Sequence, residues 1–193
     1  MQTHIHTLRD GTAISVRPLK RSDRDLIAAG FDSLSDESRY RRFMAPTSRL
    51  TPRQLDYFTQ VDQIDHFAWG VLGPLPEERP VATARYVRLN QSPEIAELAV
   101  TVVDEFQGRG VGSLLVSATA LAAEHNGIAL LKAHLLADNH RMLALLERLG
   151  GTVTEVEGAT VVVDLATGPA AELISAEERH PLTRMIEAAP LAA

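Results

Sequence analysis

A glycine-rich turn between a strand pattern and a helix pattern holds the residues best suited to bind a ligand. The sequence there reads "ELAVTVVDEFQGRGVGSLLVSATALAAEH", with glycines at positions 108, 110 and 112. A strand that passes through such a turn into a helix exposes unpaired backbone N–H groups at the positive end of the helix dipole. Because glycine has no Cβ, a phosphate group can approach these N–H groups closely. The turn therefore predicts an anion site formed by the amides of residues 108–113.

Two other phosphate-binding motifs match this turn poorly. A P-loop ends in Gly-Lys-Ser/Thr, whereas Gly112 is followed by Ser113 and Leu114. A dinucleotide-binding turn has an acidic residue about 20 positions later, at the end of the next strand. The next strand pattern here, "IALLKAHLLA", contains no acidic residue. The remaining alternative is structural, with the glycines serving only a tight turn.

A single acidic residue interrupts the apolar strand before the turn. With a side-chain period of two, Glu97 shares one face of the strand with Ala99 and Thr101, whereas Val100 points to the other face. Burial in an apolar surround would raise the pKa of Glu97 and suit it to accept a proton near neutral pH. We therefore predict Glu97 as a candidate base. The alternatives are a surface glutamate at the sheet edge, or the same role for Glu94.

The elements that position these groups follow from periodicity and capping residues. Alternation predicts strands over "TAISVRPL", "HFAWGVL", "RPVATARYVRL" and "EIAELAVTVV". Helices are predicted over "RSDRDLIAAGFDSL", "LSDESRYRRF" and "LTPRQLDYFTQV", and the last has Thr51 at its N-cap, Pro52 at the first helical position and Gln54 three residues after the cap. After the glycine-rich turn come a helix to about Asn126, the strand "IALLKAHLLA", the helix "NHRMLALLERLG" and a hairpin at Gly158.

This order of elements predicts an α/β fold of the α+β type. The succession of strand, helix and strand over residues 95–136 is a crossover, so the strand at 95–103 should run parallel to the strand at 128–136. The other strands pair as antiparallel neighbours, which gives a mixed, mostly antiparallel sheet flanked by helices. We place one domain at residues 1–168. Residues 169–193, which are interrupted by prolines, are predicted to form a short helical C-terminal extension that packs on the domain or on another subunit.

Composition narrows the possible functions. The chain has 193 residues, 45% of them hydrophobic, with a net charge of −6 and no cysteine. The excess of acidic groups disfavours nucleic acid as a partner, and a disulfide, a thiolate ligand or a cysteine nucleophile is excluded. The absence of a signal-peptide pattern and of a bilayer-spanning apolar run predicts a cytoplasmic protein that does not bind membranes. The histidines form no His-x-x-x-His pattern, so we expect no metal and interpret His4 and His6 as solvated.

The turn and its neighbours resemble the GNAT superfamily of acyl-CoA-dependent N-acyltransferases. Residues 107–112 match the signature Q/R-x-x-G-x-G/A, and the preceding strand and the following "ADNHRMLALLERLGG" occur in the family's order. The similarity covers roughly residues 12–165. It implies a GNAT-like sheet of about seven strands and acetyl-CoA as the cosubstrate, with the coenzyme's pyrophosphate cradled by the turn.

The resemblance also implies a role for individual residues. Glu97 would be the general base, acting directly or through a water, and the backbone amide near Val100 would face the thioester carbonyl. Asn139 would contact the pantetheine arm, although asparagine is also a good helix N-cap, and Arg109 would either bind the coenzyme or be solvated. The implied cofactor-binding residues are Val100, Val102, Gln107, Gly108, Arg109, Gly110, Val111, Gly112, Ser113 and Asn139.

A narrower resemblance, through residues 33–72, is to bacterial protein lysine acetyltransferases that inactivate acyl-CoA synthetases. It implies a protein lysine as the acceptor. The alternatives are a small amine, or a catalytically silent acyl-CoA-binding module. The arginines in this stretch either attract the coenzyme's 3′-phosphate or an acidic partner, or are solvated: Arg39, Arg41, Arg42, Arg49 and Arg53.

One position departs from the family pattern. Many members have a tyrosine in the last helix that protonates the leaving thiolate, and the register from Asn139 places Leu146 there. Thiols of this kind have an ordinary pKa of about 8.5, so the thiolate would leave unprotonated or take a proton from water.

Overall fold

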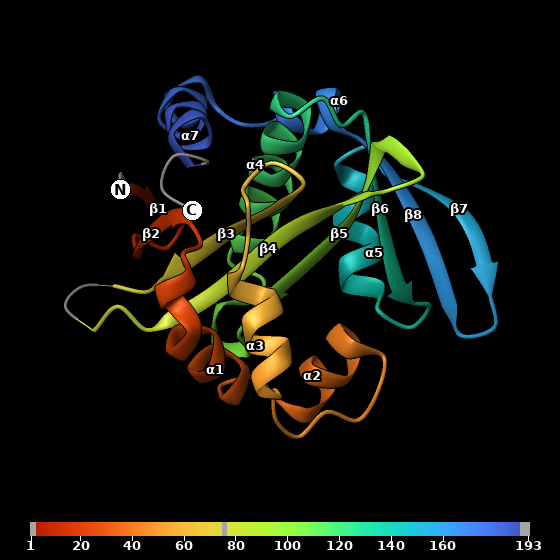
Figure 1. The fold of residues 1–193 in the computed structure, drawn as a ribbon, viewed down its shortest axis with the longest axis horizontal. Helices are drawn as coiled ribbons and strands as arrows, with labels where there is room; N and C mark the ends of the chain where they lie inside the picture. Colours follow the sequence, from red (N-terminus) through yellow and green to blue (C-terminus); the bar gives the residue numbers. More distant parts are fainter. Residues whose placement is uncertain (1–2, 75–76, 190–193) are drawn as a thin grey trace.

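The computed structural model describes residues 3–74 and 77–189 as an eight-stranded sheet with helices on both faces (Figure 1). The strands are β1 (His4–Thr7), β2 (Ala13–Pro18), β3 (His66–Leu72), β4 (Pro80–Leu89), β5 (Ser92–Val102), β6 (Leu130–Leu136), β7 (Thr152–Glu157) and β8 (Thr160–Ala166). The helices are α1 (Arg24–Asp32), α2 (Asp36–Phe43), α3 (Pro52–Thr59), α4 (Val111–His125), α5 (His140–Arg148), α6 (Thr167–Glu172) and α7 (Ala176–Ala188), with short 3₁₀ turns η1 (Arg21–Asp23) and η2 (Asp104–Phe106).

The strands lie in the order β1-β2-β3-β4-β5-β6-β8-β7, and every neighbouring pair is antiparallel except β5–β6. The predicted mixed sheet and its parallel pair are therefore confirmed. The hairpin β7–β8 turns at Gly158, whose φ of +55° explains the glycine. The eighth strand, β1, was not predicted, because its few residues lie at the chain's start and carry only a short alternating pattern.

The sheet consists of two well-paired parts that meet over a short stretch. β5 pairs with β4 along its length, and β6 pairs with β8 from Leu130 to Leu136. Between β5 and β6 only residues 95–97 and 130–132 are in register. Each part keeps its own right-handed twist, so beyond this contact the two strands diverge. The C-terminal half of β5 is therefore paired on one side only.

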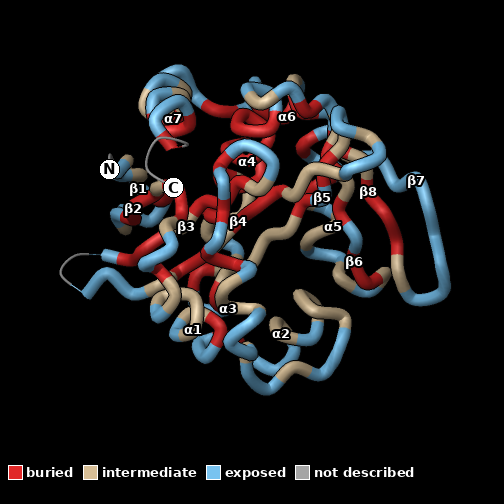
Figure 2. Tube along the Cα trace, in the orientation of Figure 1, coloured by how far each residue is buried: buried red, intermediate tan, exposed pale blue. Residues whose placement is uncertain are grey.

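Helix α4 lies on one face of the sheet and α1–α3 lie on the other (Figure 1). Most residues of α4 are buried, including Leu115, Ala118 and Ala122, and the exposed β7 contrasts with this central core (Figure 2). A helix that is apolar all round must be covered on all sides. Strands β3–β5 cover one side of α4, and α6 and α7 cover the other with residues such as Leu182 and Ile186. Residues 190–193 of the predicted extension, and residues 75–76 of the β3–β4 connection, lie outside the described residues.

The loop before β3 folds around a single carboxylate. One oxygen of Asp62 accepts hydrogen bonds from the backbone amides of Ile64, Asp65 and His66, at 2.8–2.9 Å. Burial opposes ionisation of Asp62, but these hydrogen bonds outweigh it and hold its pKa below the usual value. Gln63 adopts a positive φ of 63° and is fully buried. The loop is thus held by local polar contacts rather than by apolar packing.

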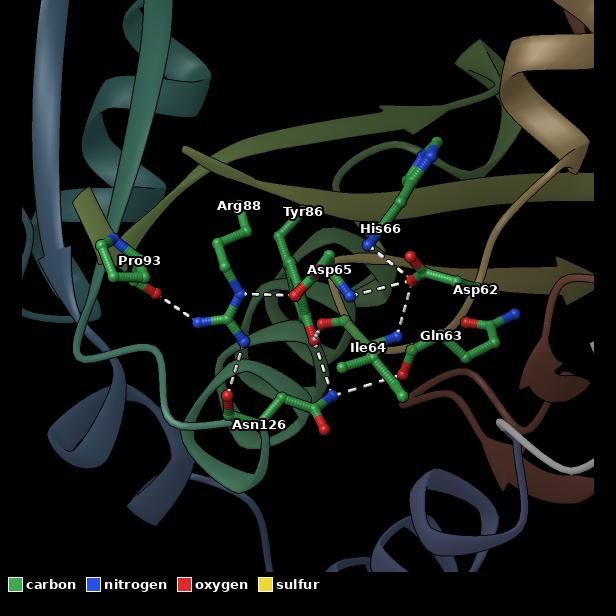
Figure 3. Close-up of polar contacts among 9 residues, drawn as sticks. All are labelled: Asp62, Gln63, Ile64, Asp65, His66, Tyr86, Arg88, Pro93 and Asn126. Carbon is green, nitrogen blue, oxygen red and sulfur yellow. Dashed lines mark hydrogen bonds and ion pairs between the residues drawn. The ribbon is translucent and has the colours of Figure 1, made fainter. Parts of the chain in front are cut away.

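A polar network ties this loop to the C-terminal end of α4 (Figure 3). Arg88 donates to Asp65 at 2.7 Å, to the carbonyl of Asn126 at 2.6 Å and to the carbonyl of Pro93. The Asn126 side chain donates to the Tyr86 hydroxyl at 2.7 Å, and burial raises the pKa of that hydroxyl. The network joins β3, β4, β5 and α4 at the edge of the sheet where β5 begins.

We expect Arg88→Met to lower the free energy of unfolding by about 2–4 kcal/mol, because a charged donor to three acceptors is lost and two carbonyl groups are left without it. Urea denaturation followed by circular dichroism measures this. The matched control is Arg79→Met, since the Arg79 side chain is 58% exposed, and it should change stability by less than about 0.5 kcal/mol. Equal effects of the two substitutions would show that the network contributes little.

Candidate functional site

The glycine-rich turn has the geometry of an anion site. Gly108 and Gly110 have φ values of +77° and +98°, and a Cβ at either position would meet no atom within 4 Å. The turn thus requires glycine for its backbone conformation and leaves the space beside it open. Gly110 is the N-cap of α4 and provides no capping side chain. The first helical hydrogen bond of α4 runs from Leu114 N to Gly110 O at 3.1 Å, so the amides of residues 111–113 have no acceptor within the helix.

Gly112 serves a different purpose from the other two glycines. Its backbone is helical, and a Cβ there would lie 3.3 Å from the side chain of Leu145. Gly112 therefore leaves room for the end of the Leu145 side chain of α5, which sequence analysis had not separated from ligand binding. A larger residue at this position would require that side chain to shift by a few tenths of an ångström.

The signature glutamine connects the elements around the turn. The Gln107 amide nitrogen donates to the carbonyl of Val102 and to Ser38 Oγ, both at 3.1 Å, and its oxygen accepts from Arg141 at 2.7 Å. These contacts fix the turn relative to β5, α2 and α5. Arg141 is a cation at the start of α5 that sequence analysis missed. The signal available was its position two residues after Asn139.

Asp104 anchors α2 to the end of β5. Its carboxylate accepts hydrogen bonds from Ser35 N, Ser35 Oγ and Ser38 Oγ at 2.8–2.9 Å. Burial opposes ionisation of Asp104, but these hydrogen bonds outweigh it and lower its pKa. The N-terminus of α2 is therefore held beside the glycine-rich turn.

The unpaired side of β5 presents the amides that were predicted to face the cosubstrate. Val103 N donates to Val81 O on the β4 side at 2.9 Å. Because successive residues of a strand direct their N–H groups to opposite neighbours, the amides of Val100 and Val102 point away from β4. Pairing with β6 ends at Glu97, so these amides face the gap between the diverging strands.

Glu97 is exposed, so the predicted burial of its carboxylate is wrong. It lies at the last paired position of β5, opposite Val87 on β4 and Lys132 on β6. Lys132 is itself paired with Asp164 at 2.9 Å, and this hydrogen bond raises the pKa of the lysine. No ion pair within the described ranges 3–74 and 77–189 includes Glu97. Its carboxylate is thus open to solvent at the apex of the gap, which is the point where β5 and β6 begin to diverge.

Glu94 is also exposed, three residues before Glu97. It lies where the register between β4 and β5 shifts, so it has no partner on β4, whereas Glu97 is opposite Val87. The two carboxylates therefore occupy different positions relative to the gap.

Three other predicted residues have identifiable contacts. Arg109 hydrogen-bonds Asp10 at 2.8 Å and Thr12 at 2.6 Å, so its charge is used to hold the β1–β2 connection in this structure. Asn139 caps α5 by accepting from Met142 N at 3.3 Å, which is its alternative structural role. Leu146 is fully buried in the core.

His4 and His6 were interpreted from the sequence as solvated, but the structure shows both side chains half-buried. His4 and His6 lie on β1 and are half-buried against α7, where His6 pairs with Glu178. Burial lowers the pKa of His4, and Glu178 opposes this. Candidate ligand atoms of these three residues lie within 4.8 Å of one another, a spacing that a metal ion could bridge. In the described structure the side-chain contact between His6 and Glu178 joins β1 to α7.

The chain belongs to the GNAT acetyltransferase family. Residues 14–152 match the family described as "Acetyltransferase (GNAT) domain". The signature turn, the parallel β5–β6 pair and the gap between these strands all fall within this range. Among the described helices, none is both long and apolar enough to cross a bilayer.

Particular relatives share much of the chain. It is 34% identical over 166 residues to acetyltransferase Pat of Mycolicibacterium smegmatis. This match covers 84% of this chain and 48% of that protein. The chain therefore spans about half the length of this relative. An acetyltransferase of Pseudomonas aeruginosa is 29% identical, and this match covers 76% of this chain and 78% of that protein. The crystal structure of the GNAT domain of S. lividans PAT superposes with a TM-score of 0.79 at 31% identity, and covers 85% of this chain and 96% of that one.

The free amides at the start of α4 can be tested one at a time. Proline is tolerated in the first turn of a helix but has no N–H, so Ser113→Pro deletes one amide, whereas Ser113→Ala keeps it. We expect Ser113→Pro to weaken coenzyme A binding about tenfold or more in calorimetry, the value of one charge-assisted hydrogen bond. Ser113→Ala should stay within about twofold. Similar affinities of the two variants, with melting temperatures unchanged, would place the pyrophosphate elsewhere.

Proposed function

We propose that this protein is an acetyl-CoA-dependent N-acetyltransferase with Glu97 as its general base. The observation that carries the proposal is the gap between β5 and β6, which has the free amides of α4 at one end and Glu97 at its apex. Membership of the GNAT acetyltransferase family supports acetyl-CoA as the cosubstrate. The proposal places the reaction in the cytoplasm and requires no metal.

The coenzyme would bind along the edge of β5. Its pyrophosphate would accept hydrogen bonds from the amides of residues 108–113, with Arg141 as the nearest added cation on α5. The pantetheine arm would pair with the backbone at Val102, in place of the missing β6 neighbour, with Asn139 beside it. Gln107 supports this edge because its side chain already satisfies the Val102 carbonyl.

Acyl transfer then needs a base, an oxyanion donor and an exit for the thiolate. Glu97 would take a proton from the acceptor ammonium, directly or through a water, and the freed lone pair would attack the thioester carbonyl. The amide of Val100 would donate to the oxyanion of the tetrahedral intermediate. Collapse of the intermediate breaks the C–S bond, and because Leu146 has no proton to give, the thiolate leaves as the anion or is protonated by water.

We expect Glu97→Gln to lower turnover by roughly 10²–10⁴-fold, the usual contribution of a general base, with little change in coenzyme binding. Activity should recover in part at alkaline pH, because the free lysine amine becomes more abundant toward its pKa of about 10.4. A thioester-consumption assay across pH measures both effects. Glu94→Gln is the matched control, since that carboxylate is also exposed on β5 but lies outside the regular β4–β5 register. Full activity of Glu97→Gln at neutral pH would assign proton removal to solvent.

A protein lysine is the acceptor that we propose. The similarity to acetyltransferase Pat and to the S. lividans PAT domain supports this choice, as does the resemblance of residues 33–72 to acetyltransferases of acyl-CoA synthetases. An exposed carboxylate on an acidic protein also favours the encounter with a cationic acceptor. Small amines satisfy the same charge argument and are the second candidate.

The acceptor is tested by incubating the protein and acetyl-CoA with acyl-CoA synthetases from the same organism, and by mapping acetyl-lysine with mass spectrometry. We expect one synthetase lysine to be acetylated and synthetase activity to fall in proportion. Glu97→Gln serves as the control for non-enzymatic acetylation. If the synthetases stay unmodified and active while a free amine is acetylated efficiently, the protein-lysine proposal is wrong and a small amine is the acceptor.

A further inference from the structure

A cavity lies on the face of the sheet that carries Glu97. It has a volume of about 70 Å³ and lies between β3–β5 and the helices α1–α3. Its wall is mainly apolar and includes Leu26, Ile27, Phe31, Phe43, Leu50 and Phe58. Thr101 of β5 also lines it, on the same face of the strand as Glu97.

Two arginines line this apolar cavity without a carboxylate partner. Arg85 is only 5% exposed, and one of its nitrogens donates to the carbonyl of Phe58 at 3.2 Å and lies 3.2 Å from His66 Nε2. Its guanidinium stacks 4.5 Å above the Phe58 ring. Arg42 lies over the Phe43 ring at 5.3 Å. Neither arginine has a carboxylate within 4.0 Å among the described residues.

The other charges of the wall cancel each other. Arg17 and Asp23 form a two-point ion pair at 2.6 and 2.7 Å. With this pair neutral, the charge of the wall is that of Arg42 and Arg85. Burying a charge is costly unless it is paired with an opposite charge. Arg85 is buried with only a carbonyl and an aromatic ring as partners, and half-buried Arg42 faces the same cavity, so the wall favours an anion from outside the chain.

Burial and mutual repulsion both act on the charges of the two arginines. Burial lowers the pKa of Arg85 to about 9, and the like charge of Arg42 adds to this effect. Burial also lowers the pKa of Arg42. His66 does not compete as a cation, because burial and then the Arg85 charge lower its pKa to about 4. At neutral pH Arg85 is still charged, and a bound anion would relieve the repulsion from Arg42.

The cavity adjoins the position where the acceptor must approach. Arg85 is opposite Ala99 in the β4–β5 register, so it is the diagonal neighbour of Glu97, about 7–8 Å away. The coenzyme's anion site is at the start of α4, which packs on the other face of the sheet. Glu97 and the cavity therefore share the acceptor's face, whereas the coenzyme binds along the edge.

We propose that this cavity binds a carboxylate on a short apolar stem, with Arg85 and Arg42 as its cationic partners. The carboxylate has two possible sources: an acceptor substrate that carries it near the reactive amine, or a separate small carboxylic acid that binds beside the acceptor. The first source depends on the proposed function, whereas binding itself does not.

Binding is tested with butyrate and its uncharged analogue butyramide, by NMR titration of the full chain. We expect saturable shifts at cavity residues with butyrate, at least about tenfold weaker binding of butyramide, and at least about tenfold weaker butyrate binding in Arg85→Met. Arg41→Met is the matched control, because Arg41 is the neighbour of Arg42 on α2 but pairs with Glu37 at 2.6 Å. Arg42→Met provides a second variant if Arg85→Met does not fold. Equal binding of the two probes, no binding, or full affinity in both cavity variants would overturn the proposal.

The source of the carboxylate is tested by acetyl transfer to 5-aminopentanoate and to its amide. If the acceptor carries the carboxylate, kcat/KM should favour the acid at least about tenfold, and Arg85→Met should remove this preference without a similar loss on the amide. If the carboxylate is a separate ligand, the two acceptors should react alike and butyrate should alter the rate on the amide. If the acid is not preferred over the amide, and butyrate does not alter the rate on the amide, the link between the cavity and the acceptor is overturned. Because butyrate binding needs no acyl transfer, its failure is distinguishable from failure of the proposed function.

Discussion

The loss of hydrogen bonding between β5 and β6 after Glu97 is the constraint on which the site depends. A strand with one unpaired side normally invites another chain, and here the free side is internal to the sheet. The gap persists because β4 and β8 each hold one of the diverging strands along its length, and because Gln107 satisfies the carbonyl of Val102. The result is an unpaired edge of β5 inside the sheet, and the proposed coenzyme site lies along it.

In the proposed coenzyme site, helix α4 must be rigid, because its first amides and the edge of β5 would contact the same ligand. Its N-terminal turn is fixed by the contacts of Gln107, and its C-terminal end by Asn126 and Arg88. Its sides are covered by the sheet and by α6 and α7. The C-terminal helices thus share the core that supports the anion site, since an all-apolar α4 would otherwise expose one side to water.

The parts of the fold that local signals govern could be predicted from the sequence. The capping box at Thr51, the N-cap at Asn139 and the positive φ of Gly110 depend on neighbours within a few positions. Two features could not be predicted from the sequence, because they depend on elements far apart in the chain. These are the exposure of Glu97 and the pairing of Arg109 with Asp10. Likewise, nothing local distinguishes a buried cavity arginine from a solvated one.

The exposure of Glu97 bears on the kind of acceptor. Proton transfer to a carboxylate becomes easier when water is excluded from it, because desolvation favours the neutral form. The chain itself leaves Glu97 open, with Val87 and the neutralised Lys132 as its cross-strand neighbours. In the proposed reaction, the acceptor would supply the cover. A protein surface docking across α1–α3 and β4 can exclude water over the whole apex, whereas a small amine covers little of it. For Glu97 as the proposed base, exposure of its carboxylate therefore favours a large acceptor over a small one.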